Sequence, residues 1–204
     1  MTVDPDRVAE QVDHARERIR RAGGADVRIV AVTKTFGPDA IAAAVGAGLD
    51  AIGENYAQEL VAKLGAYTST SNGPVPEVHF IGQLQSNKVR SLVGVVDVFE
   101  TVDRRSLVDE LVKRAPGARI LVQVDTTGAS GKGGCPVDAV PALVADAVDR
   151  GLLVEGLMTV GPTVGGPEAA RAGFRSVRRL VDELGLATCS MGMSDDLEVA
   201  VAEG

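Results

Sequence analysis

Cysteine, histidine and lysine are scarce in this chain of 204 residues. The two cysteines, Cys135 and Cys189, form no CxxC motif and no dense framework, which indicates free thiols in a reducing compartment. The two histidines, His14 and His79, argue against a histidine-rich site, and we expect no metal. Because only five lysines accompany 16 arginines, a lysine that ends an apolar run, such as Lys34, is less easily explained as incidental.

A basic surface, a secretory signal and a membrane-spanning run are also lacking. The net charge of −7 argues against nucleic-acid binding, which usually depends on a basic surface. Residues 1–11 are acidic and polar, and no apolar run approaches the roughly 18 residues that a membrane span needs. We therefore expect a cytoplasmic protein that binds neither nucleic acid nor membrane.

Short apolar runs alternate with helical patterns along the chain. After a first helix that Asp4 caps and Gly23-Gly24 ends, we expect strands near 28–34, 50–55, 78–83, 97–102, 119–125, 152–160 and 187–193. The helices expected between and after them lie near 38–47, 56–65, 86–93, 104–114, 137–150, 167–184 and 195–203. This alternation predicts a parallel α/β sheet covered by helices. No linker divides it, so we expect one domain, residues 1–204.

The number of strands is one short of a closed parallel barrel, which usually has eight. The sequence ends at Gly204, directly after the last expected helix, where an eighth barrel strand would follow. The spacing therefore predicts either an open sheet or a barrel whose eighth strand is missing from this sequence.

Polar side chains follow several of the expected strands at their carboxyl ends. Lys34 ends the first strand, Asn55 the second and Gln83 the third, while residues 190–194 end the last. Parallel α/β folds place their binding and catalytic groups at this edge of the sheet. This edge is therefore the candidate site.

Lys34 has two interpretations. As a nucleophile, an amine partly withdrawn from water at a barrel mouth forms an imine with an aldehyde or ketone. As a structural residue, it makes a salt bridge to a neighbouring carboxylate such as Glu54. The pattern alone favours neither interpretation.

Two other segments have structural interpretations that outweigh functional ones. Ser194 precedes Asp195, Asp196 and Glu198, which is typical of a helix cap, although a helix start can also bind phosphate. The glycine-rich loop 127–134 lacks the residue spacing of a phosphate-binding P-loop. His79, early in the third strand, is expected to be a hydrogen-bonded core residue.

Five segments, in order from residue 30 to the end, resemble one family: VAVTKTFGPDAI, AGLDAIGENYAQEL, HFIGQLQSNKVR, GLMTVGP with GPEAARAGF, and SMGMSDDLEVAVAEG. They are similar to the pyridoxal phosphate homeostasis proteins, single-domain relatives of the alanine racemase barrel. The resemblance implies a (β/α)₈ barrel with an extra N-terminal helix, which binds pyridoxal 5′-phosphate (PLP) through an imine to Lys34. It also implies that Ser194 contacts the phosphate and that Asn55 and Met193 lie beside the cofactor.

The resemblance implies a carrier rather than an enzyme. Such a protein holds PLP for homeostasis and delivers it, with apo PLP-dependent enzymes as candidate recipients. The alternative is a PLP-dependent amino-acid racemase or decarboxylase of the alanine racemase fold, which would carry a second domain that nothing in this sequence resembles. A cofactor-free aldolase that uses Lys34 is a third alternative, but no proton relay is visible. Because that second domain completes the dimer in such enzymes, we expect a monomer.

Two departures from the family pattern concern the loop after the fifth strand and the end of the chain. The family usually carries an acidic residue where this sequence has Gly128-Ala129-Ser130. It also continues with a glycine-rich eighth strand that bears an arginine, and this segment is absent here. We expect the sequence to be incomplete relative to the family at this end.

Overall fold

The computed structural model describes residues 3–71, 73–128 and 133–204. Its parallel strands are β1 (Ala31–Val32), β2 (Ala51–Glu54), β3 (Glu77–Phe80), β4 (Val98–Val102), β5 (Arg119–Asp125), β6 (Cys135–Pro136), β7 (Leu153–Met158) and β8 (Thr188–Ser190). Its α-helices are α1 (Pro5–Arg21), α2 (Pro38–Gly46), α3 (Ala57–Thr70), α4 (Val89–Leu92), α5 (Arg105–Arg114), α6 (Val140–Asp149), α7 (Arg171–Glu183) and α8 (Leu197–Glu203). Short 3₁₀ turns precede three of these helices, at Ser86–Lys88, Val137–Ala139 and Pro167–Ala170.

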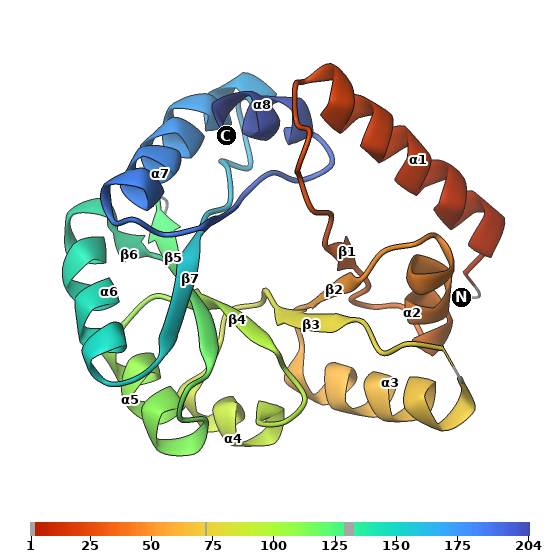
Figure 1. The fold of residues 1–204 in the computed structure, drawn as a ribbon, viewed down its shortest axis with the longest axis horizontal. Helices are drawn as coiled ribbons and strands as arrows, with labels where there is room; N and C mark the ends of the chain where they lie inside the picture. The colour runs from red at the N-terminus through yellow and green to blue at the C-terminus, as the bar shows by residue number, and fades with distance from the viewer. Residues whose placement is uncertain (1–2, 72, 129–132) are drawn as a thin grey trace.

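The strands form one curled sheet in the order β1-β2-β3-β4-β5-β7-β8, and β6 pairs only with β5. Among the described residues no ladder joins β1 to β8, so the ring of strands is open on that side. Figure 1 shows helices around the outside of the strands and α1 and α8 on the open side. The prediction of a parallel barrel-like α/β sheet with an additional first helix is confirmed, as a half-barrel.

The expected strands all occur, but several bounds differ. β1 has two residues instead of the expected seven, and β6 was not predicted, because a two-residue strand next to Gly133-Gly134 leaves no periodic signal. Helix α3 runs to Thr70, beyond the predicted end at residue 65. The extra turn persists because Tyr67 is buried and its hydroxyl donates to the Pro74 carbonyl at 2.9 Å, which anchors the end of the helix.

The first helix has the signals that the sequence predicts. The Asp4 side chain accepts hydrogen bonds from the N–H groups of Asp6 and Arg7, which lack partners inside the helix. Val12 and Ile19 are buried on one face of α1. Among the described residues no helix is both long and apolar enough to cross a membrane.

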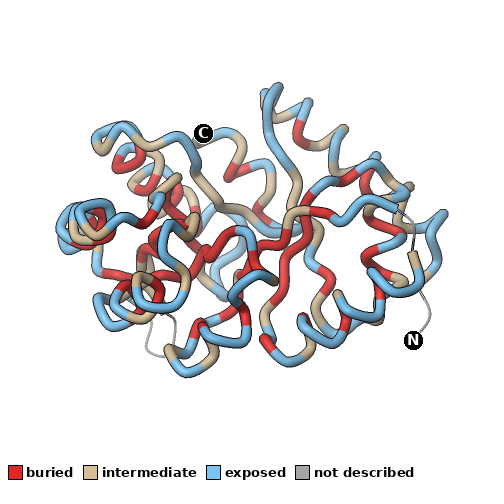
Figure 2. Tube along the Cα trace, turned by 60° about the horizontal axis from the view of Figure 1, so that its bottom comes forward, coloured by how far each residue is buried: buried red, intermediate tan, exposed pale blue. Residues whose placement is uncertain are grey.

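The hydrophobic core lies mainly between the strands and the surrounding helices, where Ile52, Phe99 and Ile120 pack with helix residues such as Leu60 and Leu111. Because strand side chains alternate between faces, neighbouring positions point to the other side of the sheet. There the buried residues Val98, Leu121 and Met158 make a small separate cluster. Figure 2 shows the buried residues concentrated along the strands and the helix faces toward them.

Candidate cofactor site

Lys34 lies in the turn directly after β1, at the carboxyl edge of the sheet, and is half-buried. Among the described residues its amine makes no hydrogen bond and no ion pair. The predicted alternative, a salt bridge to Glu54, is wrong. Glu54 Oε1 instead accepts hydrogen bonds from Lys63 Nζ at 2.5 Å and from the Thr33 hydroxyl at 2.6 Å. Lys34 is therefore left as an amine available to a ligand.

Two buried oxygens at the end of β2 have no partner among the described residues. They are Oε2 of Glu54 and Oδ1 of Asn55. The neighbouring strand is β1, with Val32 opposite Gly53, so both oxygens belong to the same edge as Lys34. A buried polar atom without a hydrogen bond costs about 1–3 kcal/mol. Glu54 turns toward Lys63 of α3, so the Asn55 oxygen is the acceptor that this edge offers to a ligand with a hydrogen-bond donor.

Sequence reasoning missed the role of Lys63. Its ammonium is buried, and besides Glu54 it contacts the Thr33 carbonyl at 2.7 Å and Glu59 Oε1 at 2.8 Å. The only signal in the sequence is the Glu-x-x-x-Lys spacing of Glu59 and Lys63, which on a helix is usually an exposed pair. Burial of the pair depends on where α3 packs against β1 and β2.

Met193 and Ser194 follow β8, which is the last strand in the order of the sheet, as β1 is the first. Both are exposed, and the Ser194 hydroxyl has no hydrogen bond among the described residues. The prediction that Ser194 caps the last helix is wrong: α8 begins at Leu197, and Asp196 precedes it as the cap residue. The side chain of Asp196 turns back and accepts from the Met193 N–H at 2.5 Å, which fixes the loop and leaves the Ser194 hydroxyl free.

Arg18 of α1 connects the β8–α8 loop to the N-terminal side of the molecule. Its guanidinium donates to the Ser194 carbonyl at 2.8 Å and to both Glu198 oxygens at 2.6 Å. Farther along, a Cβ on Gly24 would lie 2.8 Å from Val201 of α8. The segment that leads from α1 to β1 therefore lies against α8, across the open side of the sheet (Figure 1). Lys34 and Asn55 thus lie at the carboxyl ends of the adjacent strands β1 and β2. Met193 and Ser194 lie after the carboxyl end of β8, the strand at the far end of the sheet order.

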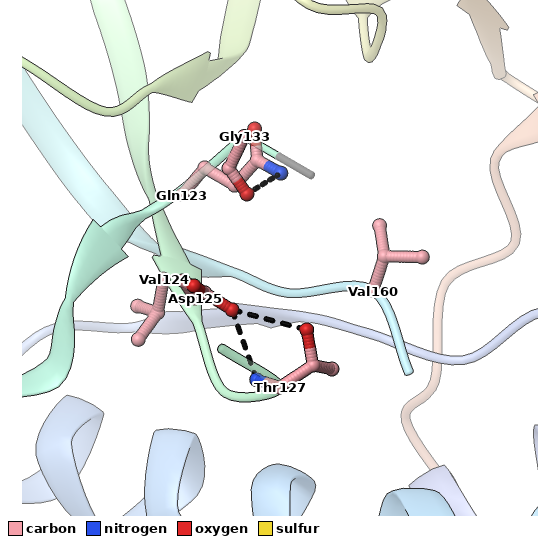
Figure 3. A pocket seen from close by; sticks show the side chains of 6 residues that line it. All are labelled: Gln123, Val124, Asp125, Thr127, Gly133 and Val160. Atoms are coloured by element: carbon pink, nitrogen blue, oxygen red, sulfur yellow. Dashed lines mark hydrogen bonds between the residues drawn. The ribbon is translucent and has the colours of Figure 1, made fainter. Parts of the chain in front are cut away.

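A small cavity of about 140 Å³ lies at the carboxyl ends of β5 and β7. Figure 3 shows its lining residues, Gln123, Val124, Asp125, Thr127, Gly133 and Val160. Gln123 donates to the Gly133 carbonyl at 3.0 Å, and Asp125 accepts from the N–H and hydroxyl of Thr127. The sequence did not predict this cavity. Of the three residues that depart from the family pattern, Ala129 and Ser130 lie outside the described residues.

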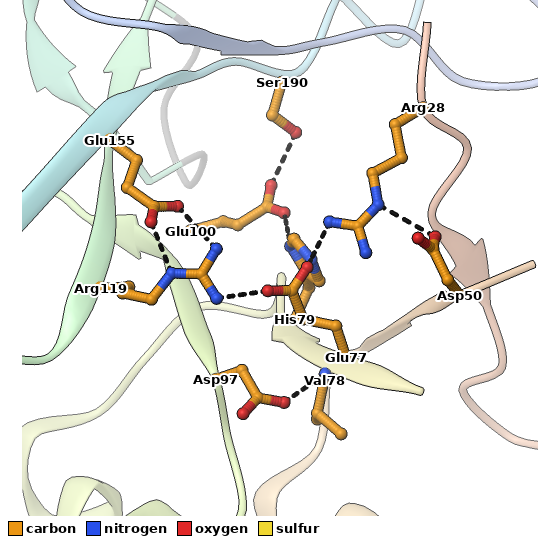
Figure 4. Close-up of polar contacts among 10 residues, drawn as sticks. All are labelled: Arg28, Asp50, Glu77, Val78, His79, Asp97, Glu100, Arg119, Glu155 and Ser190. Carbon is orange, nitrogen blue, oxygen red and sulfur yellow. Dashed lines mark hydrogen bonds and ion pairs between the residues drawn. The ribbon is translucent and has the colours of Figure 1, made fainter. Parts of the chain in front are cut away.

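The opposite, amino-terminal edge of the sheet is occupied by charged side chains that pair with one another (Figure 4). Glu77 of β3 lies between Arg28 and Arg119, and Arg119 also pairs with Glu155 of β7. His79 is buried and hydrogen-bonded to Glu100 at 2.5 Å, which confirms the prediction of a core histidine. Since these groups satisfy one another, the carboxyl edge is the one left for a ligand.

Both cysteines are free, as predicted. Burial raises the pKa of the Cys189 thiol to about 11 and also raises that of Cys135. Thiols protonated to this extent are poor nucleophiles. This leaves Lys34 as the reactive group that the site offers.

Comparison with known proteins connects this geometry to one family. Residues 3–202 match the model of the alanine racemase N-terminal domain. A pyridoxal phosphate homeostasis protein of Aquifex aeolicus is 37% identical over 209 residues, which cover 97% of this chain and 90% of that protein. The protein of the same name from Pseudomonas aeruginosa is also 37% identical, over 211 residues and with the same coverage.

Solved structures agree. PipY of Synechococcus elongatus, determined with PLP bound, superposes with a TM-score of 0.83 at 29% identity, covering 97% of this chain and 94% of PipY. Lysine decarboxylase of Selenomonas ruminantium reaches a TM-score of 0.67 at 20% identity, with 96% of this chain but 54% of the enzyme covered, and shares the fold alone. The chain belongs to the pyridoxal phosphate homeostasis protein family, whose barrel is the alanine racemase N-terminal domain.

Proposed function

We propose that this chain binds PLP as an imine on Lys34 and holds the cofactor for PLP homeostasis instead of catalysing a reaction with it. One observation carries the proposal: the unengaged amine of Lys34 and the unpartnered buried oxygen of Asn55 lie at the carboxyl ends of adjacent strands. The names of the relatives and the PLP-bound PipY structure support it.

The chemistry requires little besides the amine. PLP supplies an aldehyde carbon that accepts an amine. The uncharged Lys34 amine adds to this carbon and one water molecule leaves, so atoms balance and nothing is oxidised or reduced. The exposed turn after β1 gives the departing water a path to solvent.

The residues around Lys34 fit the cofactor. The unpartnered oxygen of Asn55 is an acceptor for an N–H group that the bound cofactor presents. From the loop after β8, the Ser194 hydroxyl donates to the phosphate, with Met193 beside it. The bond from Met193 N–H to Asp196 draws that carboxylate to the backbone of the loop, which reduces repulsion of the phosphate.

The carboxylates near Lys34 favour holding over catalysis. Racemisation or decarboxylation needs a second group that moves a proton at the reacting carbon. Glu54 and Glu59 are instead engaged by Lys63, at 2.5 and 2.8 Å. We therefore expect the PLP-loaded protein to leave L-alanine unracemised, and robust turnover would overturn the non-catalytic part of the proposal.

The decisive experiment for the imine is borohydride trapping with PLP, followed by peptide mass mapping. The adduct is expected on Lys34, and Lys34→Ala should abolish the visible imine band. Lys88→Ala is the matched control, because Lys88 is also half-buried and follows the next-but-one strand. A label spread over Lys88 and Lys113, with Lys34 unmodified, would contradict the proposal.

The homeostasis role needs a separate test. We propose that the protein acts as a monomer and passes PLP to apo PLP-dependent enzymes. Light scattering tests whether the protein is a monomer. Reactivation of an apoenzyme by the loaded protein, compared with an equal concentration of free PLP, tests whether it passes on the cofactor.

A further inference from the structure

The turn that carries Lys34 has a backbone conformation that L-residues rarely adopt. Thr35 has φ +68°, and it is the one non-glycine residue with a positive φ in the described part of the chain. For a β-branched residue this conformation is a true outlier, and such strain costs of the order of 1–3 kcal/mol. Surrounding contacts must therefore hold the turn in place.

Two side chains of α3 hold the backbone on both sides of Lys34. Glu59 Oε1 accepts a hydrogen bond from the Thr35 N–H at 2.6 Å. Lys63 Nζ donates to the Thr33 carbonyl at 2.7 Å. Being four residues apart on one helix, Glu59 and Lys63 also pair with each other at 2.8 Å. One ion pair thus contacts the peptide groups before and after Lys34.

The ion pair is itself anchored in the interior. The Lys63 ammonium has three N–H donors, and three oxygens receive them: Glu54 Oε1, Glu59 Oε1 and the Thr33 carbonyl. Its side chain is only 3% exposed, so water competes little for these bonds. Burial raises the pKa of Glu59, but the hydrogen bonds from Lys63 and Thr35 outweigh it and leave that pKa below its ordinary value. The Glu59 carboxylate therefore stays charged at neutral pH, and the three oxygens leave Lys63 no donor for another partner.

We propose that Glu59 and Lys63 are positioning residues for Lys34: they lock the strained turn so that its amine faces the carboxyl edge where the aldehyde arrives. This inference rests on the proposed imine and adds a device that accelerates its formation. Without the lock, the turn relaxes to unstrained conformations and the amine spends less time in the reactive position. Misplacement of a reacting group by about 1 Å can cost about 100-fold in rate.

The test compares variants that remove the contacts of Glu59 completely or in part. Glu59→Ala removes the acceptor of the Thr35 N–H and leaves Lys63 paired with Glu54, so no buried charge is stranded. Glu59→Gln keeps an oxygen that can accept from Thr35 but loses the charge. Glu110→Ala is the control, because Glu110 pairs with Arg114 at the same helical spacing on α5 and touches no such turn.

Three quantities are measured for each variant well below its melting temperature. They are the rate constant of imine formation with PLP, the pH midpoint of the imine band, and amide hydrogen exchange in residues 33–36. We expect Glu59→Ala to slow imine formation about 10- to 100-fold, to shift the midpoint and to speed exchange at Thr35. Glu59→Gln should recover most of the rate, and Glu110→Ala should match the wild type.

The outcomes separate this inference from the proposed function. An adduct on Lys34 in the wild type together with an unchanged rate in Glu59→Ala overturns the positioning role and leaves the imine intact. A lowered melting temperature without a change in rate or exchange also overturns it, because the residues would then be merely structural. If the wild type forms no adduct on Lys34, the proposed function fails and this inference fails with it.

Discussion

Ser190 Oγ donates a 2.6 Å hydrogen bond to Glu100 Oε2 and so joins β8 to β4, two strands that are not neighbours in the sheet. The other oxygen of Glu100 binds His79, which in turn contacts Glu77 at 3.2 Å (Figure 4). A chain of polar contacts therefore crosses the inside of the half-barrel and ties its last strand to its middle. The stability of the open sheet should depend on these polar contacts between Ser190, Glu100, His79 and Glu77.

The stability of the protein above pH 6.5 should depend on His79. Burial lowers the pKa of His79, but the hydrogen bond and charge of Glu100, with those of Glu77, outweigh it and raise the pKa above its ordinary value of 6.5. A raised folded-state pKa stabilises the protein fully below pH 6.5, and this contribution is lost as pH rises through the folded pKa. We expect the difference in unfolding free energy between wild type and His79→Gln to shrink with rising pH. A difference that stays constant above pH 6.5 would refute the linkage.

Acid should destabilise the protein by protonating Glu77. Burial raises the pKa of this carboxyl, but hydrogen bonds from Arg119, Arg28 and His79 lower it to about 2, against an ordinary 4.5. The resulting stability is present above pH 4.5 and is lost as pH falls toward 2. Denaturant titrations between these values should show a falling unfolding free energy. In Glu77→Gln the decline should be shallower, because the titrating group is gone.

Ser190→Ala tests the contact across the sheet. The substitution leaves one oxygen of the buried Glu100 without its donor, so we expect a loss of about 1–3 kcal/mol in unfolding free energy. Ser91→Ala is the control, because the Ser91 hydroxyl donates at 2.8 Å to the Lys88 carbonyl on an exposed surface. Equal losses in the two variants would show that the link between β8 and β4 carries no special weight.

The sequence predicts the fold of this chain better than its polar contacts. The alternation of short apolar runs with helical patterns locates every strand except the two-residue β6, even though several strands carry polar residues on one face (Figure 4). Contacts such as that between Lys63 and Glu54, nine positions apart, depend on how α3 packs on β2 and leave no periodic trace. The sequence therefore leaves a salt bridge from Lys34 to Glu54 as one of two interpretations. It also places the cap of the last helix at Ser194, two residues before the observed cap residue Asp196.

A further prediction addresses the β8–α8 loop through Arg18. Its bond to the Ser194 carbonyl holds the loop that presents the Ser194 hydroxyl. Arg18→Met should weaken PLP binding severalfold but leave binding of pyridoxal, which lacks the phosphate, nearly unchanged. Arg21→Met is the control, because Arg21 pairs with Glu17 on its own helix and with no other residue in the described part of the chain. Equal weakening of both ligands would argue against a phosphate contact at this loop.

Gly82 provides a steric test of the site. This residue follows β3, and a Cβ there would lie 2.6 Å from the Asn55 Cα and closer still to the Asn55 carbonyl oxygen. Since both are backbone atoms, neither can rotate away, and Gly82→Ala must displace the segment that carries Asn55. We expect weaker PLP binding and slower imine formation together with a loss of stability. The control is Gly65→Ala, because Gly65 lies in α3 with open space around its Cβ and should gain about 0.5–1 kcal/mol. If Gly82→Ala binds PLP as tightly as the wild type does, Asn55 is not part of the cofactor site, and its unpartnered oxygen needs another explanation.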